Sequence, residues 1–202
     1  RKGAWEFFFD AHTGGVPDPA SSPSAVIVST IALEPYLARG GTQLKTRLKD
    51  FARGLEHLQA MLEYEQIYLV MPNVKSELAR TVRQTLRGFA WVNLVDVPLR
   101  YPFGDLALLA RRIGLKRDPD RPVWGLPVAG VLAVDRALTV GRPATVRIVA
   151  IGGPAVAEPV HVHVRRPRAD DETTSAGARA GPGGIAQVGG GGGGASESER
   201  SR

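Results

Sequence analysis

The chain has 202 residues, of which 43% are hydrophobic, and this suits one packed domain with additional sequence. It contains no cysteine, which excludes disulfides, thiolate zinc sites, cysteine-ligated iron–sulfur clusters and cysteine nucleophiles from this chain. No apolar run approaches the length of a membrane span, and the opening residues lack the pattern of a secretion signal. Because the first residue is arginine, we expect a fragment or a processed form.

The chain is basic, with a formal net charge of +6 and a pI near 10.1, a common sign of nucleic-acid binding. Its basic side chains, however, fall on predicted helix surfaces and are not interleaved with exposed aromatic residues. Residues 167–202 contain four basic and five acidic side chains, so the positive excess belongs to the preceding residues. We therefore expect no nucleic-acid partner and favour contact with an acidic partner or an anionic membrane surface.

Residues 1–23 are predicted to form a partial N-terminal connector. They contain an aromatic cluster, Trp5 and Phe7–Phe9, followed by a loop rich in proline, glycine and serine. We expect the aromatic cluster either to end an element that begins outside the chain or to pack onto the core as a tether.

A regular pattern begins at Ser24. The continuous apolar run Ala25–Thr30 predicts a strand that is buried on both faces. Six apolar residues then recur four and three positions apart, which predicts one stripe of a helix with Thr42 as its N-cap. These six are Leu44, Leu48, Phe51, Leu55, Leu58 and Leu62.

The middle of the chain continues this alternation of strands and helices. Ile67–Met71 and Trp91–Val97 are predicted strands, and a helix that starts near Ser76 separates them. After the second of these strands, Asp105 is expected to cap a helix that ends at Gly114.

Four further elements are predicted after Gly114. Val123-Trp124 is a brief strand, and Ala129–Val140 is a helix that Gly141 and a following proline end. The β-branched run Thr145–Ile151 predicts another buried strand, whereas the strict alternation of Val160–Val164 predicts a strand with one solvent-exposed face.

Strands that alternate with helices of ten or more residues imply βαβ units and a mostly parallel sheet covered on both faces. The sequence therefore predicts the α/β class, with a Rossmann-like three-layer domain over residues 24–157 and right-handed crossovers. Residues 158–166 are expected to start a small β domain. Residues 167–202 form a glycine-rich tail that is too poor in hydrophobic side chains to offset chain entropy, so we expect it to be disordered.

Two patterns suggest ligand chemistry. The segment Arg39–Thr42 (RGGT) precedes a helix, where free amides and the helix dipole favour a phosphate, but it matches neither glycine-rich phosphate motif, and we favour a structural turn. His161 and His163 lie on one side of a predicted strand and suggest a shared metal, but no third ligand has convincing spacing. We favour a strand with a polar outer face, and we predict no metal site.

Single carboxylates offer little evidence for acid–base catalysis. Asp96, Asp105 and Asp135 are interpreted as caps or solvated side chains, because paired catalysis needs two carboxylates in one pocket. Ser29-Thr30 and Tyr101–Gly104 each follow a predicted strand, and open α/β sheets bind ligands at the carboxyl ends of their strands. The turn at Tyr101–Gly104 is therefore a candidate ligand contact, with a proline-fixed packing turn as the alternative.

Three segments resemble the A subunit of the Na+-translocating NADH:quinone reductase and its relative, the C subunit of the Rnf electron-transport complex. They are Gly15–Thr30, Arg100–Asp105 (RYPFGD) with the helix to Gly114, and Val146–Val156 (V-x-x-V-A-I-G-G-P-A-V). The likeness spans Trp5 to Val164. In such proteins a barrel-like domain precedes the Rossmann-like domain and a small β-grasp-like (SLBB) domain follows. The resemblance implies that the first is missing here and that the second barely begins.

The chain departs from both relatives. The Rnf protein has cysteine-ligated iron–sulfur clusters, so the lack of cysteine favours the reductase A subunit. That A subunit usually has a His-Pro-Ala-Gly turn followed by Gly-Thr-His, whereas Tyr101–Gly104 is closer to the Rnf form and lacks that continuation. We therefore describe the chain as a divergent, truncated relative.

The resemblance to the reductase A subunit implies a peripheral protein on the cytoplasmic side of the bacterial inner membrane. Such a protein holds no flavin, takes part in quinone binding and docks onto membrane subunits that transport sodium. NADH, FMN or FAD and the [2Fe–2S] cluster would be bound by partner subunits, and ubiquinone would be the substrate of the complex. No residue of this chain is expected to be catalytic or to bind a cofactor.

A quinone headgroup needs an apolar slot and a hydrogen-bond donor. We therefore predict Tyr101, Phe103, Gly104 and Trp124 as quinone- or partner-binding residues. Three alternatives stay open: a stand-alone nucleotide- or flavin-binding α/β module that uses RGGT and the strand-end turns, a protein similar to the Rnf C subunit, and a non-functional remnant.

Overall fold

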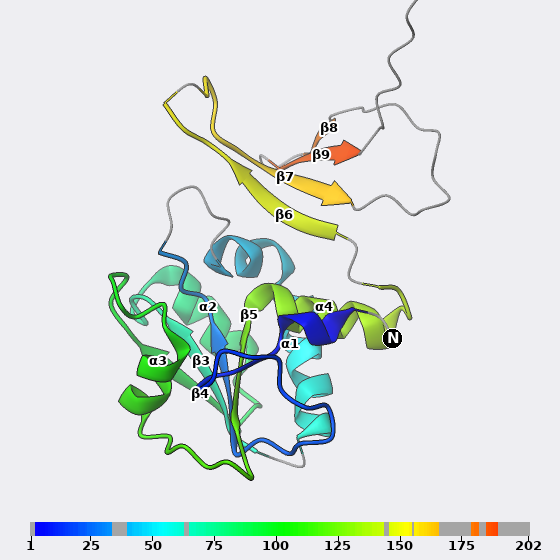
Figure 1. Cartoon of the computed structure of the whole chain (residues 1–202). Helices are drawn as coiled ribbons and strands as arrows, with labels where there is room; N and C mark the ends of the chain where they lie inside the picture. Colours follow the sequence, from blue (N-terminus) through cyan, green and yellow to red (C-terminus); the bar gives the residue numbers. More distant parts are fainter. Residues whose placement is uncertain are drawn as a thin grey trace, which may run out of the picture. The chain divides into compact units, whose positions relative to one another are not determined.

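A mostly parallel sheet organises residues Arg1–Ala144, the first of two units into which the chain divides (Figure 1). The second unit is Thr145–Arg202. The computed structural model describes residues 3–33, 40–62, 65–143, 146–154, 156–165, 179–181 and 185–189.

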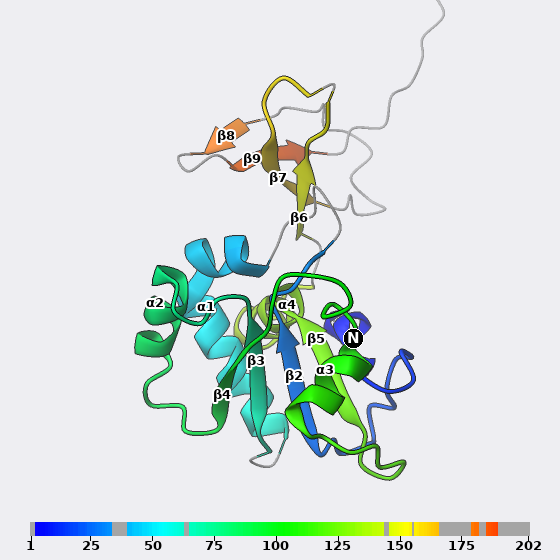
Figure 2. The same cartoon turned by 90° about the vertical axis from the view of Figure 1, so that its left-hand side faces the viewer.

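The five strands of the first unit lie in the order β1-β5-β2-β3-β4. Their bounds are Phe9–Asp10 (β1), Ala25–Ser29 (β2), Ile67–Met71 (β3), Val92–Asp96 (β4) and Val123–Pro127 (β5). Strands β5, β2, β3 and β4 are parallel (Figure 2). Strand β1 pairs antiparallel with β5. This arrangement confirms the predicted α/β class with a mostly parallel sheet.

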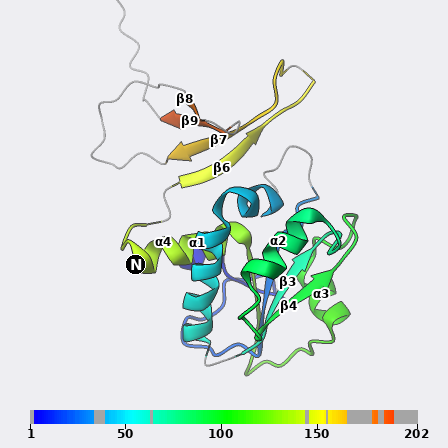
Figure 3. The same cartoon turned by 180° about the vertical axis from the view of Figure 1, so that it is seen from behind.

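Four helices cover the sheet on its two faces: α1 (Gly40–Met61), α2 (Glu77–Thr85), α3 (Leu106–Ile113) and α4 (Val128–Thr139). One apolar cluster joins the sheet to α1, α2 and α4, and a second cluster joins the opposite face to α3 (Figures 2 and 3). Along β2, Val26 and Val28 belong to the first cluster and Ile27 to the second. All three are fully buried, as the continuous apolar run predicted.

Side chains cap both α2 and α3, and the predicted cap at Asp105 is confirmed. The Ser76 hydroxyl accepts a hydrogen bond from the amide of Ala79 at 3.2 Å, and the Asp105 carboxylate accepts one from the amide of Leu108 at 2.9 Å. Gly114 follows α3 with a φ of 88°, a left-handed conformation that favours glycine.

The predicted N-cap of α1 at Thr42 is wrong, because the helix begins at Gly40 and Thr42 is its third residue. A Cβ atom at Gly40 would lie 2.8 Å from both Thr30 Cα and Val128 Cγ2. The helix therefore approaches the ends of β2 and β5 too closely for any residue larger than glycine.

The N-terminal segment is more than the predicted connector. Its short 3-10 helix η1 (Ala4–Phe7) and strand β1 belong to the fold, and Phe8 is 1% exposed. Phe8 stacks on Trp5 at 4.5 Å between ring centroids. The aromatic cluster thus packs onto the core, one of the two predicted roles.

Strand β6 (Val146–Ile151) corrects the prediction for Thr145–Ile151 and the predicted domain end at residue 157. It pairs antiparallel with β7 (Val160–Arg165) in the second unit and is no part of the parallel sheet. A β-branched run predicts a strand but not its burial or its partner. Here β6 is an edge strand of the order β6-β7-β9-β8, and Val149 and Ile151, two residues apart on one face of it, are 41% and 42% exposed.

The second unit also bears on the predicted small β segment and tail. Strand β7 confirms the alternating strand at Val160–Val164, with Val162 buried. Strands β8 (Arg179–Gly181) and β9 (Ile185–Gly189) fall within residues 167–202, where disorder was predicted. The other residues of 167–202 lie outside the described part of the chain.

Candidate functional site

The sheet has its topological switch point between β5 and β2. From β2 the chain adds β3 and then β4 on one side, and it returns to place β5 on the other side of β2. Open α/β sheets bind ligands at the carboxyl ends of the strands beside such a point. Ser29-Thr30 and the chain that leaves β2 lie here, as the sequence predicted.

The hydroxyl groups at this edge are engaged by backbone. Thr30 is 4% exposed, and its hydroxyl donates to the carbonyl of Val70 at 3.0 Å. The Ser29 hydroxyl accepts from the amide of Ile31 at 3.1 Å. Gly40 and Gly41 form the first turn of α1, and Arg39 of the RGGT segment lies outside the described residues. The close packing of Gly40 against Thr30 supports the structural interpretation of this glycine pair.

The turn Tyr101–Gly104 reaches the same edge of the sheet. A Cβ atom at Gly104 would lie 3.3 Å from Leu33 Cδ1, and Leu33 is on the segment that leaves β2. Phe103 packs in the apolar cluster on the α3 side, with the Arg112 guanidinium carbon 5.2 Å from its ring centroid. Tyr101 is 88% exposed. The turn thus presents an exposed phenol beside a half-buried aromatic ring.

Trp124, the fourth predicted residue, lies elsewhere. It is 4% exposed and belongs to the cluster on the opposite face, where it meets Trp5 at 5.1 Å and Phe8 at 5.6 Å edge-to-face. It is also the second residue of β5, away from the carboxyl end of the strand. The structure therefore groups Tyr101, Phe103 and Gly104 and separates Trp124 from them. The buried Trp124 indole nitrogen has no hydrogen-bond partner among the described residues.

Asp135, predicted to be a cap or a solvated side chain, is instead the centre of an ionic network between α1 and α4. It is 2% exposed and accepts from Arg53 Nε at 2.6 Å and Nη2 at 2.8 Å. Thr139 donates to it at 3.0 Å. The hydrogen bond to Asp135 raises the pKa of Arg53 above its usual value. The apolar stripe of α4 offered no signal for this pair, because its partner lies 82 residues away.

Asp50 extends the network along α1. It pairs with Arg53 at 3.0 Å and with Arg47 at 3.0 Å. Partial burial works to raise the pKa of Asp50, but the hydrogen bonds and charges of Arg47 and Arg53 outweigh it and lower that pKa below its usual value. These groups join helices, and we assign them a structural role.

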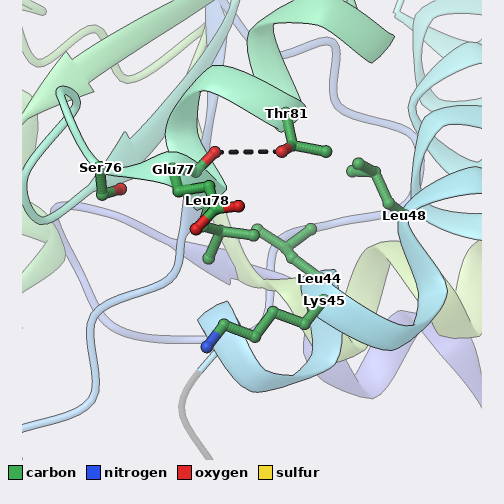
Figure 4. Close-up of a pocket in the computed structure, with 7 residues that line it drawn as sticks. All are labelled: Leu44, Lys45, Leu48, Ser76, Glu77, Leu78 and Thr81. Carbon is green, nitrogen blue, oxygen red and sulfur yellow. Dashed lines mark hydrogen bonds between the residues drawn. The ribbon is translucent and has the colours of Figure 1, made fainter.

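An open pocket of about 480 Å³ lies between the first turns of α1 and α2 (Figure 4). Three leucines and four polar residues line it. The leucines are Leu44, Leu48 and Leu78, and the polar residues are Lys45, Ser76, Glu77 and Thr81. The sequence predicted Leu44 and Leu48 only as part of the core stripe of one helix, and nothing in it indicated that they line an open volume.

Neither a metal cluster nor a membrane span is found within the described residues. Among them, no three His, Cys, Asp or Glu side chains gather closely enough to hold a metal ion. His161 and His163 do share one side of β7, opposite the buried Val162. No helix in the same part of the chain has the length and apolar character needed to cross a membrane.

Comparison with known proteins shows which protein families this chain resembles. Curated relatives include the C subunit of the ion-translocating oxidoreductase complex of Erwinia tasmaniensis, 24% identical over 70% of this chain and 18% of the relative. The Salmonella typhimurium protein of the same name is 25% identical over 70% of this chain and 20% of its own length. The C subunit of the proton-translocating ferredoxin:NAD(+) oxidoreductase complex of Clostridium ljungdahlii is 24% identical over 78% and 35%.

The chain thus spans about a fifth to a third of the length of these relatives. A family match covers most of the first unit. Residues 1–143, almost the entire first unit, match the family described as NqrA second alpha/beta domain. The chain belongs to this family.

Proposed function

We propose that this chain is part of a subunit of an ion-translocating, NADH-linked oxidoreductase complex, in which the α/β unit serves as a docking module and not as a redox centre. The family match over residues 1–143 carries this proposal. It is supported by relatives that are named as subunits of such complexes. The lack of cysteine agrees with it, because these 202 residues offer no thiolate to an iron–sulfur cluster.

The finer proposal is the A subunit of a Na+-translocating NADH:quinone reductase on the cytoplasmic side of the bacterial inner membrane. Ubiquinone is then the substrate of the complex, and NADH, FMN or FAD and the [2Fe–2S] cluster belong to partner subunits. The family description supports this proposal. The relatives that are named as C subunits support the neighbouring alternative, a protein similar to the Rnf C subunit.

Within this proposal, the turn at Tyr101, Phe103 and Gly104 contacts quinone or a partner protein of the complex. Its place at the carboxyl edge, its exposed phenol and its half-buried aromatic ring support this role, since quinone needs an apolar slot and a donor. The proposal leaves out Trp124, which is buried on the other face of the sheet.

The alternative of a stand-alone nucleotide- or flavin-binding module has weaker support. A phosphate at the switch point would need free donors, but the Thr30 hydroxyl donates to the Val70 carbonyl, the Ile31 amide donates to the Ser29 hydroxyl, and Gly40 packs against Thr30. The experiment below therefore includes flavin and nucleotide as competing ligands.

The test is purification of the tagged natural protein from detergent-solubilised membranes of its host, with titration of the isolated chain with FMN, NADH and a short-chain quinone. We expect co-purification with other subunits and NADH-dependent quinone reduction. Purification without partners, together with tight FMN binding by the isolated chain, would overturn the proposal.

A matched pair of variants tests the turn. Tyr101→Phe removes the exposed hydroxyl and is expected to raise the KM for quinone in the complex about three- to tenfold, the effect of one lost hydrogen bond. Tyr68→Phe on β3 is the control, because the Tyr68 hydroxyl makes no hydrogen bond with the described residues. Equal KM values in both variants would remove Tyr101 from the quinone contact.

A further inference from the structure

Helix α1 is kinked at Arg47, and the kink shapes the pocket of Figure 4. Arg47 has a φ of −133° and a ψ of 32°, so the short arm Gly40–Thr46 and the long arm Leu48–Met61 diverge (Figure 3). The Thr46 hydroxyl donates back to the carbonyl of Gln43 at 3.3 Å, a bond that bends helices. As a result, Leu44 and Leu48 flank the kink and face α2 across an open volume.

The floor of the pocket is apolar. Leu44 is fully buried, and Leu48 and Leu78 are half-buried members of the main apolar cluster. The pocket is open to solvent, and no described residue fills its volume of about 480 Å³, so the two helices do not pack closely where these leucines lie. Its size falls within the range of small-molecule sites, roughly 300–1,000 Å³.

The polar rim combines satisfied hydroxyl groups with two charged side chains. The Ser76 hydroxyl caps α2, and the Thr81 hydroxyl donates to the Glu77 carbonyl at 3.0 Å, so both have partners inside the fold (Figure 4). By contrast, the exposed side chains of Lys45 and Glu77 form no ion pair within the part of the chain that the structure describes. Lys45 lies across from the first turn of α2, whose dipole also favours an anion.

We propose that this pocket binds a small amphiphile, with its apolar body on the three leucines and its anionic group at Lys45. Glu77, the acid on the same rim, weakens the binding of an anion and sets a limit on affinity. The pocket shares no residue with the turn at Tyr101–Gly104, so the inference goes beyond the proposed function and stands apart from it.

The probe is 8-anilinonaphthalene-1-sulfonate, which joins an aromatic body to a sulfonate, titrated into the complete 202-residue chain and followed by fluorescence. N-phenyl-1-naphthylamine, which has the same aromatic body without the charge, serves as the neutral probe. We expect one sulfonate probe per chain, bound more tightly than the neutral probe, with cooperative unfolding in every variant.

Three variants separate the pocket from general surface charge. Lys45→Glu is expected to weaken sulfonate binding about tenfold and to leave neutral-probe binding unchanged. Glu77→Gln is expected to strengthen sulfonate binding about threefold, because it removes a like charge. Lys49→Glu, a reversal on the same helix outside the pocket, is the matched control and leaves both affinities unchanged.

Equal loss of sulfonate binding in the Lys45→Glu and Lys49→Glu variants would overturn the proposal, since only net charge would then matter. Unchanged binding in Lys45→Glu would overturn it as well. The same holds if the neutral probe binds as tightly as the sulfonate probe to the unsubstituted chain, because the pocket would then have no preference for an anion.

Discussion

Helix α1 meets two neighbours in opposite ways. Its long arm packs tightly on α4, where a Cβ atom at Gly54 would lie only 2.5 Å from the carbonyl oxygen of Val131. Its short arm faces α2 across the open pocket, where a Cβ atom at Gly41 would lie 3.3 Å from Leu78 Cδ2. At Gly54 the neighbouring atom belongs to the backbone of α4, whereas at Gly41 it is the movable end of the Leu78 side chain.

This difference separates a structural contact from a recognition surface. The long arm of α1 has Phe51, Leu55 and Leu58 fully buried in the main apolar cluster, which includes α4, and the Arg53–Asp135 pair joins the two helices. Substitutions there are expected to change stability. The α1–α2 contact leaves leucines beside an unfilled volume, so substitutions on its rim are expected to change binding more than stability.

The largest expected effect on stability comes from adding one methyl group to α1, either at the contact with α4 or at the contact with α2. Gly54→Ala is expected to lower the free energy of unfolding by about 2 kcal/mol, because the Val131 backbone cannot move aside. Gly41→Ala is expected to raise it by up to about 1 kcal/mol, because the Leu78 methyl can shift and alanine favours the helix. Urea unfolding followed by circular dichroism measures both, and equal changes would contradict the comparison.

Asp135→Asn is expected to have the next largest effect. It removes the charge that accepts two hydrogen bonds from Arg53 in a buried site, at a cost of about 2 kcal/mol of unfolding free energy. Glu56→Gln on the exposed side of α1 is the control, expected to change stability by less than about 0.5 kcal/mol. In a protein that already carries Arg53→Gln, Asp135→Asn should lower the free energy of unfolding by a smaller amount. If the effects of the two substitutions simply add, the two side chains are not coupled.

Local and periodic features were predicted well from the sequence. Strands β2, β3 and β4, the start of α2 near Ser76 and the cap at Asp105 depend on near neighbours, and the structure confirms them. The placement of β6 could not be predicted in this way, because strand pairing is decided by the partner that a strand meets. Strand β1 was missed since its two residues give no period to detect.

The candidate site was only half predictable. The rule that ligands bind at strand ends placed Tyr101–Gly104 correctly at the carboxyl edge, whereas Trp124 was chosen for its aromatic character, which suits a core equally well. The Arg53–Asp135 pair and the pocket escaped prediction because both arise between helices far apart in the sequence. The kink at Arg47 had no breaker such as proline to announce it.

The smallest expected effect concerns Asp50, which connects the two regions by pairing with Arg47 at the kink and with Arg53 at the α4 contact. Because folding lowers its pKa, Asp50 stabilises the protein fully above the usual aspartate pKa, and this contribution is lost as pH falls toward the lowered value. The stability difference between the unsubstituted chain and Asp50→Asn should therefore be constant above about pH 5 and shrink as pH falls through the usual aspartate pKa and below it. This difference should stay below about 1 kcal/mol and weaken in salt, since the Asp50 side chain is 35% exposed.

Urea unfolding across this pH range measures the difference, with Glu56→Gln as the reference. If this difference in unfolding free energy stays constant with pH, the charge of Asp50 stabilises neither the kink nor the contact with α4. The two regions would then be joined by the helix backbone alone.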